Sequence, residues 1–591
     1  MRSTRLTLAI GAALTLLAAG CAERSAPKRD VVAVNVVSAP EPAPPPPSLD
    51  KKFKDQDEQK LESIVVTGSR IRRVDLETAQ PVSGLAPRAV LVQGQLQGAA
   101  ASPQNTERYQ DHADNPVQRT AENPVSTFSI DVDTGSYANV RRMLTDGELP
   151  PADAVRAEEF LNYFDYGYAP PATRETPFRV TTEVAPAPWN AQRQLMLVGI
   201  KGYEVPKSQI PAANIVFLID TSGSMADANK LPLLREAFKR MVPNLRAHDR
   251  VAIVVYAGSA GLVLEPTPGD QHERIVAALD ALSAGGSTNG GAGIALAYSL
   301  AQQSFIKGGV NRVILATDGD FNVGTTDNEA LKTLVADKRK SGIALTTLGF
   351  GEGNYNEETA EQLADVGNGN HAYIDTLAEA NKVLGDELSS TMLTIAKDVK
   401  VQVEFNPALV AEYRLIGYEN RALRREDFNN DKVDAGEIGA GHDVTALYEL
   451  TLVGSGVDAS DALRYGTSKP APSNDANELA FVKLRYKQPD ADVSKLVQFP
   501  VKRTDIAAAP GERLRFAAAV AAFADSLRGG THLDGYDLAA VARLAREARG
   551  ADPSGYRAEF VQLIEQAVSL KTREVASVQI TEPVAEPGAP R

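Results

Sequence analysis

Cysteine is almost absent from this chain: Cys21 is the only one among 591 residues. A disulfide needs two cysteines close together, so the folded part of one chain holds none. Histidine is limited to six residues. Those six show no spacing typical of a zinc site, and no Ser/His/Asp or Cys/His set can be assembled from the sequence. We therefore expect no zinc centre and no nucleophilic triad, and we interpret the protein as a non-enzyme.

Clusters of basic residues are also missing. The chain has 62 Lys and Arg against 76 Asp and Glu, which gives a formal net charge of −14 and a pI near 5.2. Binding to nucleic acid depends on patches of Lys and Arg that neutralise phosphates. We therefore exclude nucleic acid as the main partner. The length exceeds what one hydrophobic core supports, so we expect two to four domains.

No apolar run is long enough to span a bilayer. The N-terminal run, residues 6–19, has about 14 residues, too short for a hydrocarbon core roughly 30 Å thick. Arg2 and Arg5 precede the run, and small residues follow it at Ala19 and Gly20. This order of a basic, an apolar and a small-residue segment is typical of a signal peptide. We predict that residues 1–20 are removed.

The end of that segment, Leu17-Ala-Ala-Gly-Cys21, resembles the lipobox of bacterial lipoproteins. The resemblance implies that Cys21 is lipidated and anchors the protein in the cell envelope. Ala22 stands where a retention signal would place Asp. This implies that the protein is anchored in the outer membrane and faces the periplasm. The alternative is an ordinary signal peptide with a chance cysteine.

Residues 21–122 show no sustained helical or strand period and are predicted to be a disordered, Pro-rich linker. Ala39–Pro47 should be a stiff polyproline spacer. Glu62–Arg73 resembles the segment at the start of TonB-dependent outer-membrane receptors. Its β-branched part, Ile64–Ile71, could therefore add as a strand to a TonB-type transducer. The alternative, which we favour, is that this run is an apolar, adhesive patch of the disordered linker.

Residues 213–395 alternate between strand and helix patterns. Asn214–Ile219 is a continuous apolar run, which indicates a strand buried on both faces, and Leu231–Leu245 is an amphipathic helix. The alternation continues to a closing helix at Leu377–Thr394. This order predicts an α/β fold, a doubly wound and mostly parallel sheet with helices on both faces.

The flanking segments have different patterns. We predict an N-terminal companion domain at 123–212, a β-sandwich-like C-terminal companion at 396–508, and a helical segment at 509–571. The last residues, 572–591, are rich in Pro, Ala and Glu and are predicted to be a disordered tail.

Three polar side chains, Asp220, Ser222 and Ser224, directly follow the buried strand Asn214–Ile219. Ligands of open α/β sheets bind where strands end and loops converge. A carboxylate and hydroxyls are hard oxygen ligands, suited to Mg²⁺ or Mn²⁺ rather than zinc. Thr288, before a predicted helix, and Asp318, at the end of a predicted strand, fall at the same edge of the sheet.

This set resembles the metal-ion-dependent adhesion site of von Willebrand factor type A (VWA) domains. The resemblance implies that Asp220, Ser222 and Ser224 are the DxSxS ligands, that Thr288 is the threonine ligand, and that Asp318 is the second acidic ligand, acting through water. All five residue types match the family pattern. The alternative is that the chain has kept the fold of the VWA domain but does not bind a metal.

The ligand count suggests a mechanism. Five protein ligands leave one octahedral position, which an Asp or Glu of a protein partner could fill. The family resemblance also implies that the closing helix can shift when the metal gains a ligand. A second hypothesis is a structural envelope protein in which the metal only rigidifies the loop.

Both flanks resemble the companion domains of one bacterial VWA lipoprotein family. The matching stretches are Ser126–Arg142, Leu149–Phe164 and Glu437–His442. Within the first, Asp133-Thr-Gly-Ser also matches the tetrad of aspartic peptidases, but that chemistry needs a second aspartate sharing a proton and no second Asp-Thr-Gly follows. We interpret Asp133 as part of a turn.

Asp427–Asp431 starts like a calcium loop. Lys432 and Ile438 stand where an EF-hand needs glycine and a bidentate Glu. An acidic turn is the better interpretation of this stretch.

Overall fold

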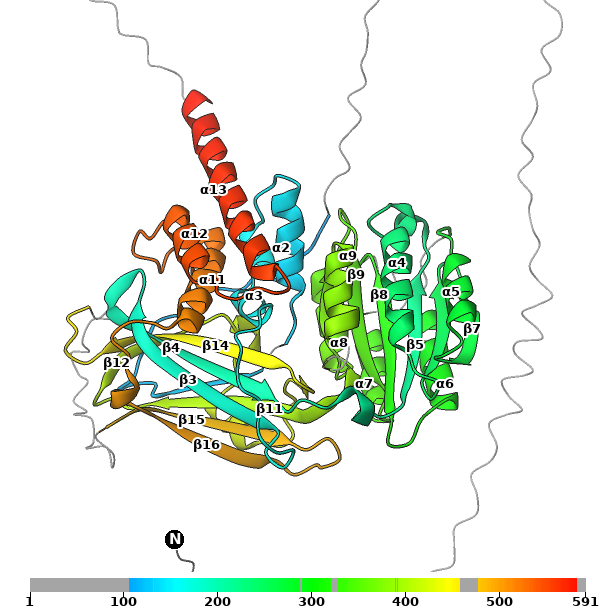
Figure 1. Cartoon of the computed structure of the whole chain (residues 1–591), viewed down its shortest axis with the longest axis horizontal. Coiled ribbons are helices and arrows are strands. Elements are labelled where there is room, and N and C mark those ends of the chain that lie inside the picture. Colours follow the sequence, from blue (N-terminus) through cyan, green and yellow to red (C-terminus); the bar gives the residue numbers. More distant parts are fainter. Residues whose placement is uncertain are drawn as a thin grey trace, which may run out of the picture. The chain divides into compact units, whose positions relative to one another are not determined.

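The computed structural model describes residues 106–130, 132–286, 290–319, 328–387, 390, 392–457 and 477–581 (Figure 1). These residues belong to one compact unit that begins at Gly98. The predicted signal peptide, Cys21 and Ile64–Ile71 lie outside them. No helix in the described ranges is long and apolar enough to cross a membrane.

The middle of the chain forms one six-stranded sheet, as the sequence predicts. All neighbouring strands are parallel except the last pair, β6 and β7. In spatial order the strands are β10 (His371–Ile374), β9 (Ala344–Phe350), β8 (Val310–Thr317), β5 (Ala213–Asp220), β6 (Arg250–Tyr256) and β7 (Ala260–Pro268). Every residue of β5 and β8 is buried, because helices cover both faces of the sheet.

Helices cover both faces of this sheet (Figure 1). On one face lie α4 (Leu231–Met241), α5 (His272–Asp280) and α9 (Leu377–Asn381). On the other lie α6 (Gly290–Gln303), α7 (Asn328–Arg339) and α8 (Glu357–Val366). We call residues 213–387 the VWA unit. Its doubly wound, mostly parallel architecture confirms the predicted fold class.

The predicted closing helix, Leu377–Thr394, is too long. After α9 the chain continues as one π-helical stretch, Lys382–Asp386, and Thr394 already begins strand β11. Residues 388, 389 and 391 lie outside the described ranges. The prediction was wrong at this end because Thr394 and Ala396 pair with a distant strand, at Gly439 and Ile438, and this pairing is invisible to local periodicity.

The segments on either side of the VWA unit form two further sheets. One has the order β1 (Gln118–Arg119), β12 (Val410–Ile416), β14 (Asp443–Leu452), β4 (Asn190–Gly202) and β3 (Phe178–Ala187). The other has the order β13 (Ile438–Gly439), β11 (Thr394–Phe405), β15 (Glu478–Lys487) and β16 (Lys495–Lys502), with β2 (Val125–Ser129) also paired to β11. Each sheet contains strands from both ends of the chain.

Helices from both ends also pack together. They are α2 (Gly135–Thr145), α3 (Ala157–Asn162), α11 (Glu512–Arg528), α12 (Leu538–Glu547) and α13 (Tyr556–Thr581). Aromatic rings fill the core that these helices share. The ring centroids of Tyr137 and Tyr163 are 3.9 Å apart in a stacked pair, and those of Phe560 and Phe164 are 5.3 Å apart in an edge-on pair. We call residues 106–205 and 394–581 together the composite domain.

Strand β4 shows why the composite domain has two cores. Its alternate residues Met196 and Val198 face the core between the two sheets, whereas Leu195 and Leu197 face the helices. Gly199 lies under the ring of Tyr168, where a Cβ atom would come within 2.2 Å of ring carbons. A stretch of strand buried on both faces needs an apolar residue at nearly every position, which is the pattern of Leu195–Ile200 within β4.

Several predicted boundaries therefore need correction. The predicted disordered linker, 21–122, is wrong at its end, because Gln118–Arg119 already forms strand β1 and pairs with β12. We predicted the flanks 123–212, 396–508 and 509–571 as separate parts, but they share their sheets and cores. Alternation reveals that a segment is a strand without revealing which strand it pairs with. The predicted tail, 572–591, is also wrong at its start, because α13 continues to Thr581. Residues 582–591 lie outside the described ranges.

Candidate metal centre

The DxSxS motif lies at the carboxyl end of β5, as the sequence predicts. Asp220 is the last residue of that strand, and Asp318 directly follows the neighbouring strand β8. Because Ile219 is paired with Ala316 in these parallel strands, the two carboxylates reach the same edge of the sheet. Both residues are fully buried.

Hydrogen bonds fix the geometry of the loop after β5. The backbone N–H of Ser222 donates to Asp220 Oδ1 at 2.8 Å, and the hydroxyls of Ser222 and Ser224 lie 3.0 Å apart. Thr317 Oγ1 donates to Asp220 Oδ2 at 3.4 Å. One carboxylate and two hydroxyls are thus held close together.

The glycine-rich loop before α6 is joined to this motif by its backbone. Gly285 N–H donates to the carbonyl of Thr221 at 2.8 Å, and Gly223 N–H donates to the carbonyl of Gly286 at 3.1 Å. The predicted ligand Thr288 follows in this loop, but residues 287–289 lie outside the described ranges. The structure therefore places four of the five predicted ligands, and the position of Thr288 stays a prediction.

Burial controls the charge of the site. It raises the pKa of Asp220 from the usual 3.8 to about 6, and the N–H and hydroxyl of Ser222 counteract this by stabilising the carboxylate. A second buried carboxylate, Asp318, adds further negative charge. Buried carboxylates are costly unless a cation compensates them.

The donor set fits a hard divalent cation. Within the described ranges no three His, Cys, Asp or Glu side chains gather into a metal-holding group. The predicted set is of another kind, because it has only two carboxylates and its other ligands are hydroxyls. Oxygen-only ligands of this type suit Mg²⁺ or Mn²⁺.

Sequence reasoning missed two residues at this edge, Lys230 and Asn354. The ammonium of Lys230 lies 3.0 Å from Asp318 Oδ2, and the Asn354 amide donates to the same oxygen at 3.2 Å. Lys230 is the N-cap residue of α4. A cation is unfavourable at a helix N-terminus, so a lysine at the start of a predicted helix was a usable signal for a nearby carboxylate.

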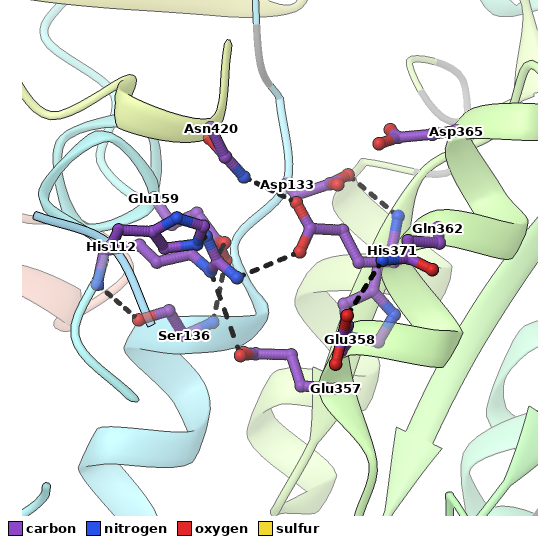
Figure 2. A network of polar contacts seen from close by, with 12 residues as sticks. His112, Asp133, Ser136, Glu159, Glu357, Glu358, Gln362, Asp365, His371 and Asn420 are labelled. Carbon is purple, nitrogen blue, oxygen red and sulfur yellow. Dashed lines mark hydrogen bonds and ion pairs between the residues drawn. The ribbon is translucent and has the colours of Figure 1, made fainter. Parts of the chain in front are cut away.

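Asp133, the candidate for peptidase chemistry, lies in the composite domain where that domain contacts the VWA unit (Figure 2). Its Oδ1 accepts the backbone N–H of His371 at 2.8 Å, and its Oδ2 lies 3.4 Å from the guanidinium of Arg421. Aspartic peptidases need a second aspartate that shares a proton. The observed partners are an amide and a cation, which favours a structural role.

The candidate calcium loop is also engaged in internal contacts. Asp427 accepts from the guanidinium of Arg424 at 3.0 Å, and Asp431 accepts from the hydroxyl of Ser494 at 2.6 Å. Such contacts fit the acidic turn that we favoured.

Arg156 is the centre of a buried charge network that joins the composite domain and the VWA unit. Figure 2 shows the residues that surround this network. Its guanidinium lies 3.2 Å from Glu361 and 3.8 Å from Glu357, both on α8, and 3.4 Å from Glu159 of the composite domain. It also lies 2.6 Å from His112 Nε2. Burial raises the pKa of Glu357 to about 8.

A second network holds the closing segment of the VWA unit. Arg141 of α2 donates to both oxygens of Asp375, at 2.8 and 2.5 Å, and to Glu379 of α9 at 2.8 Å. The hydroxyl of Tyr163 donates to the same Glu379 oxygen at 2.7 Å. Further along, the ammonium of Lys382 lies over the Tyr163 ring. The segment that the family resemblance expects to shift is therefore tied to the composite domain.

Comparison with known protein families gives three matches that together extend over most of the described chain. The model "von Willebrand factor type A domain" matches residues 214–386. The model "Uncharacterized protein YfbK, C-terminal" matches residues 390–570, and the model "von Willebrand factor" matches residues 103–197.

Individual proteins are also similar to this chain. The uncharacterized protein YfbK of Escherichia coli (strain K12) is 52% identical over 469 residues, which cover 78% of this chain and 81% of YfbK. The human inter-alpha-trypsin inhibitor heavy chain H3 is 25% identical over 260 residues, 40% of this chain and 28% of its own length. A solved von Willebrand factor type A structure from Catenulispora acidiphila has 15% identity and a TM-score of 0.39, covering 65% of this chain and 89% of that one.

Proposed function

Because the chain belongs to the family of YfbK and carries a von Willebrand factor type A domain, a domain type known for protein interactions, we propose that it is a metal-dependent binding protein. In this proposal the VWA unit holds Mg²⁺ or Mn²⁺ through Asp220, Ser222 and Ser224, with Asp318 as the second acidic residue. Thr288 is the fifth predicted ligand. An Asp or Glu of a protein partner completes the shell of the metal.

One observation carries the proposal. Two fully buried carboxylates, Asp220 and Asp318, end neighbouring parallel strands beside two hydroxyls that lie 3.0 Å apart. A divalent cation would neutralise both carboxylates and would accept the hydroxyl oxygens as ligands. When bound, such an ion supplies an exposed positive charge for a carboxylate of the partner. The role is one of binding rather than catalysis.

The first test measures metal binding alone. Calorimetric titration of the full chain with Mn²⁺ should show one site, and Asp220→Ala should weaken it by more than about 100-fold, since even outer-shell partners of a metal contribute about 10- to 100-fold. Asp280→Ala is the matched control, because Asp280 is an exposed aspartate of α5 paired with Arg235 and Lys239. A wild-type chain that binds no Mn²⁺ contradicts the proposal.

The second test separates adhesion from a purely structural metal. An envelope extract is passed over the immobilised wild-type chain, Asp220→Ala and Asp280→Ala, with Mg²⁺ and again with chelator. Adhesion predicts partners that are lost both with chelator and in Asp220→Ala, but retained in Asp280→Ala. If captured proteins survive both treatments while chelation still lowers the thermal stability, the metal only rigidifies the loop.

The location of the protein is a separate proposal that rests on the sequence. We propose that lipidated Cys21 anchors the chain in the outer membrane, facing the periplasm, and that the chain between Cys21 and the composite domain spaces the folded part from the lipid surface. Cys21→Ser should move the protein from the membrane fraction to the soluble envelope fraction. Contact of Ile64–Ile71 with a TonB-type transducer stays a prediction, to be tested by deleting residues 62–73.

A further inference from the structure

The side chain of Lys230 is buried at the edge of the VWA sheet, with 5% of it exposed. Its aliphatic part crosses Gly351, where a Cβ atom would come within 2.3 Å of Lys230 Cγ. Gly351 has a φ of +76°, a conformation that glycine adopts without strain. The backbone thus leaves room for this one lysine side chain.

The ammonium of Lys230 lies among oxygen atoms at the metal centre. It is 3.0 Å from Asp318 Oδ2 and 3.0 Å from Asn354 Oδ1. The amide of Asn354 also donates to Asp318 Oδ2. The carboxylate that the metal needs is therefore held by a charged donor and by a neutral donor.

The charges at this edge do not balance without a metal. Asp220 and Asp318 bring two buried carboxylates, and Lys230 brings one ammonium. A buried carboxylate without a cation destabilises the fold, so the ammonium offsets part of this cost. A divalent cation then experiences repulsion from the ammonium as well as attraction to the carboxylates.

We propose that Lys230 is a tethered counter-ion of the metal centre, which stabilises Asp318 when no metal is bound and lowers the affinity for the metal. This inference rests on the proposed function. With a divalent ion in place, the two carboxylates and the ammonium leave the site with one net positive charge. That charge favours an acidic partner group. Lys230 therefore weakens the binding of the metal and strengthens the attraction to the partner.

The test compares Lys230→Met with the wild-type chain, using Mn²⁺ alone as the probe. Methionine keeps an unbranched apolar side chain over Gly351, and Asn354 still donates to Asp318, so the main change is the lost charge. Lys239→Met is the matched control, because Lys239 lies on the same helix and pairs with Glu236 and Asp280 at the surface. Calorimetry gives the affinity, and thermal unfolding with and without chelator gives the stability.

We expect Lys230→Met to bind Mn²⁺ at least about tenfold more tightly, as removal of a like charge from a buried site predicts. In chelator it should unfold at a lower temperature than the wild type, and Mn²⁺ should raise its midpoint by more. Lys239→Met should match the wild type in both measurements.

Other outcomes overturn specific claims. If the wild type binds Mn²⁺ and Lys230→Met binds it equally or more weakly, the counter-ion inference is wrong while the proposed function stands. If the wild type binds no Mn²⁺, the proposed function fails first. Should Lys230→Met not fold, Lys230→Gln keeps a neutral donor near Asp318 and must show the same gain in affinity.

Discussion

The VWA unit and the composite domain are assembled in opposite ways. In the VWA unit the six sheet strands all come from residues 213–374, and most consecutive strands are joined by a single helix. In the composite domain, β4 (190–202) pairs with β14 (443–452), and β2 (125–129) pairs with β11 (394–405). The whole VWA unit is inserted between these partners.

This difference shows which parts of a fold can be predicted from local sequence patterns. A buried parallel strand and its covering helix each leave a local pattern in the sequence. The pairing of two strands that are hundreds of residues apart leaves none, because alternation reports burial and not the identity of the neighbour. The composite domain therefore depends on contacts between the chain ends, and the VWA unit does not. Three predictions, with five substitutions in all, examine this contrast.

The largest effect is expected from Phe560→Ala in the composite core. Phe560 is fully buried on α13 and contacts the rings of Phe164 and Phe523. Its loss should lower the free energy of unfolding by about 4 kcal/mol, typical for a buried aromatic residue. Hydrogen exchange should show lost protection in α2 and α3 as well as in α11–α13, with β5 and β8 still protected.

Phe238→Ala is the counterpart in the VWA unit, where Phe238 stacks on Phe217 at 4.3 Å. This substitution should accelerate hydrogen exchange around α4 and β5 and leave hydrogen exchange in the helices of the composite domain unchanged. If Phe560→Ala loosens α13 alone, the interleaved core of the composite domain is not cooperative, and the contrast between the two regions disappears.

A somewhat smaller effect is expected from Arg141→Met, which breaks the connection between the two regions. Asp375 and Glu379 would remain buried without their guanidinium partner. Breaking such a buried pair costs about 3 kcal/mol. Chemical denaturation should show this loss, and hydrogen exchange should accelerate in residues 377–386.

Arg240→Met is the control for that experiment. Arg240 is exposed and touches the same closing segment from outside, at Asn381. Its replacement should change stability by less than about 0.5 kcal/mol, as for most surface contacts. Equal effects of the two substitutions would show that the buried network does not hold the segment.

The last effect is small near pH 5 and grows with pH, at the junction between α8 and the composite domain. Glu357 has a folded pKa of about 8, raised from 4.5 by burial and by its neighbours Glu361, Glu158 and Glu107, against the opposing charge of Arg156. The unfolded chain releases this proton near pH 4.5 and the folded chain only near pH 8, so Glu357 destabilises the fold increasingly as pH rises between these values.

Glu357→Gln removes that dependence. Relative to the wild type, the variant should become more stable as pH rises from 5 to 8, by up to about 1.4 kcal/mol for each pH unit, since that is the free energy of one pKa unit. Denaturant titrations at several pH values measure the difference. A constant difference across this range would contradict the raised pKa of Glu357.

Much of the VWA unit follows from sequence alone. The apolar run Asn214–Ile219 had to be a strand buried on both faces, and its end had to bring Asp220 to the edge of the sheet. The predicted helix Leu231–Leu245 corresponds to α4 and the 3₁₀ turn Val242–Asn244 that follows it. The predictions succeeded here because each element interacts mainly with its neighbours along the chain.

Only the tertiary structure decided which distant groups meet. Nothing in the local pattern around Lys230 specifies Asp318 as its partner, and nothing around Arg141 specifies Asp375 and Glu379. Periodicity records which side of an element is buried, because burial depends on the element's own apolar face. The partner of a buried charge depends on how separate elements pack, and that packing is a property of the whole fold.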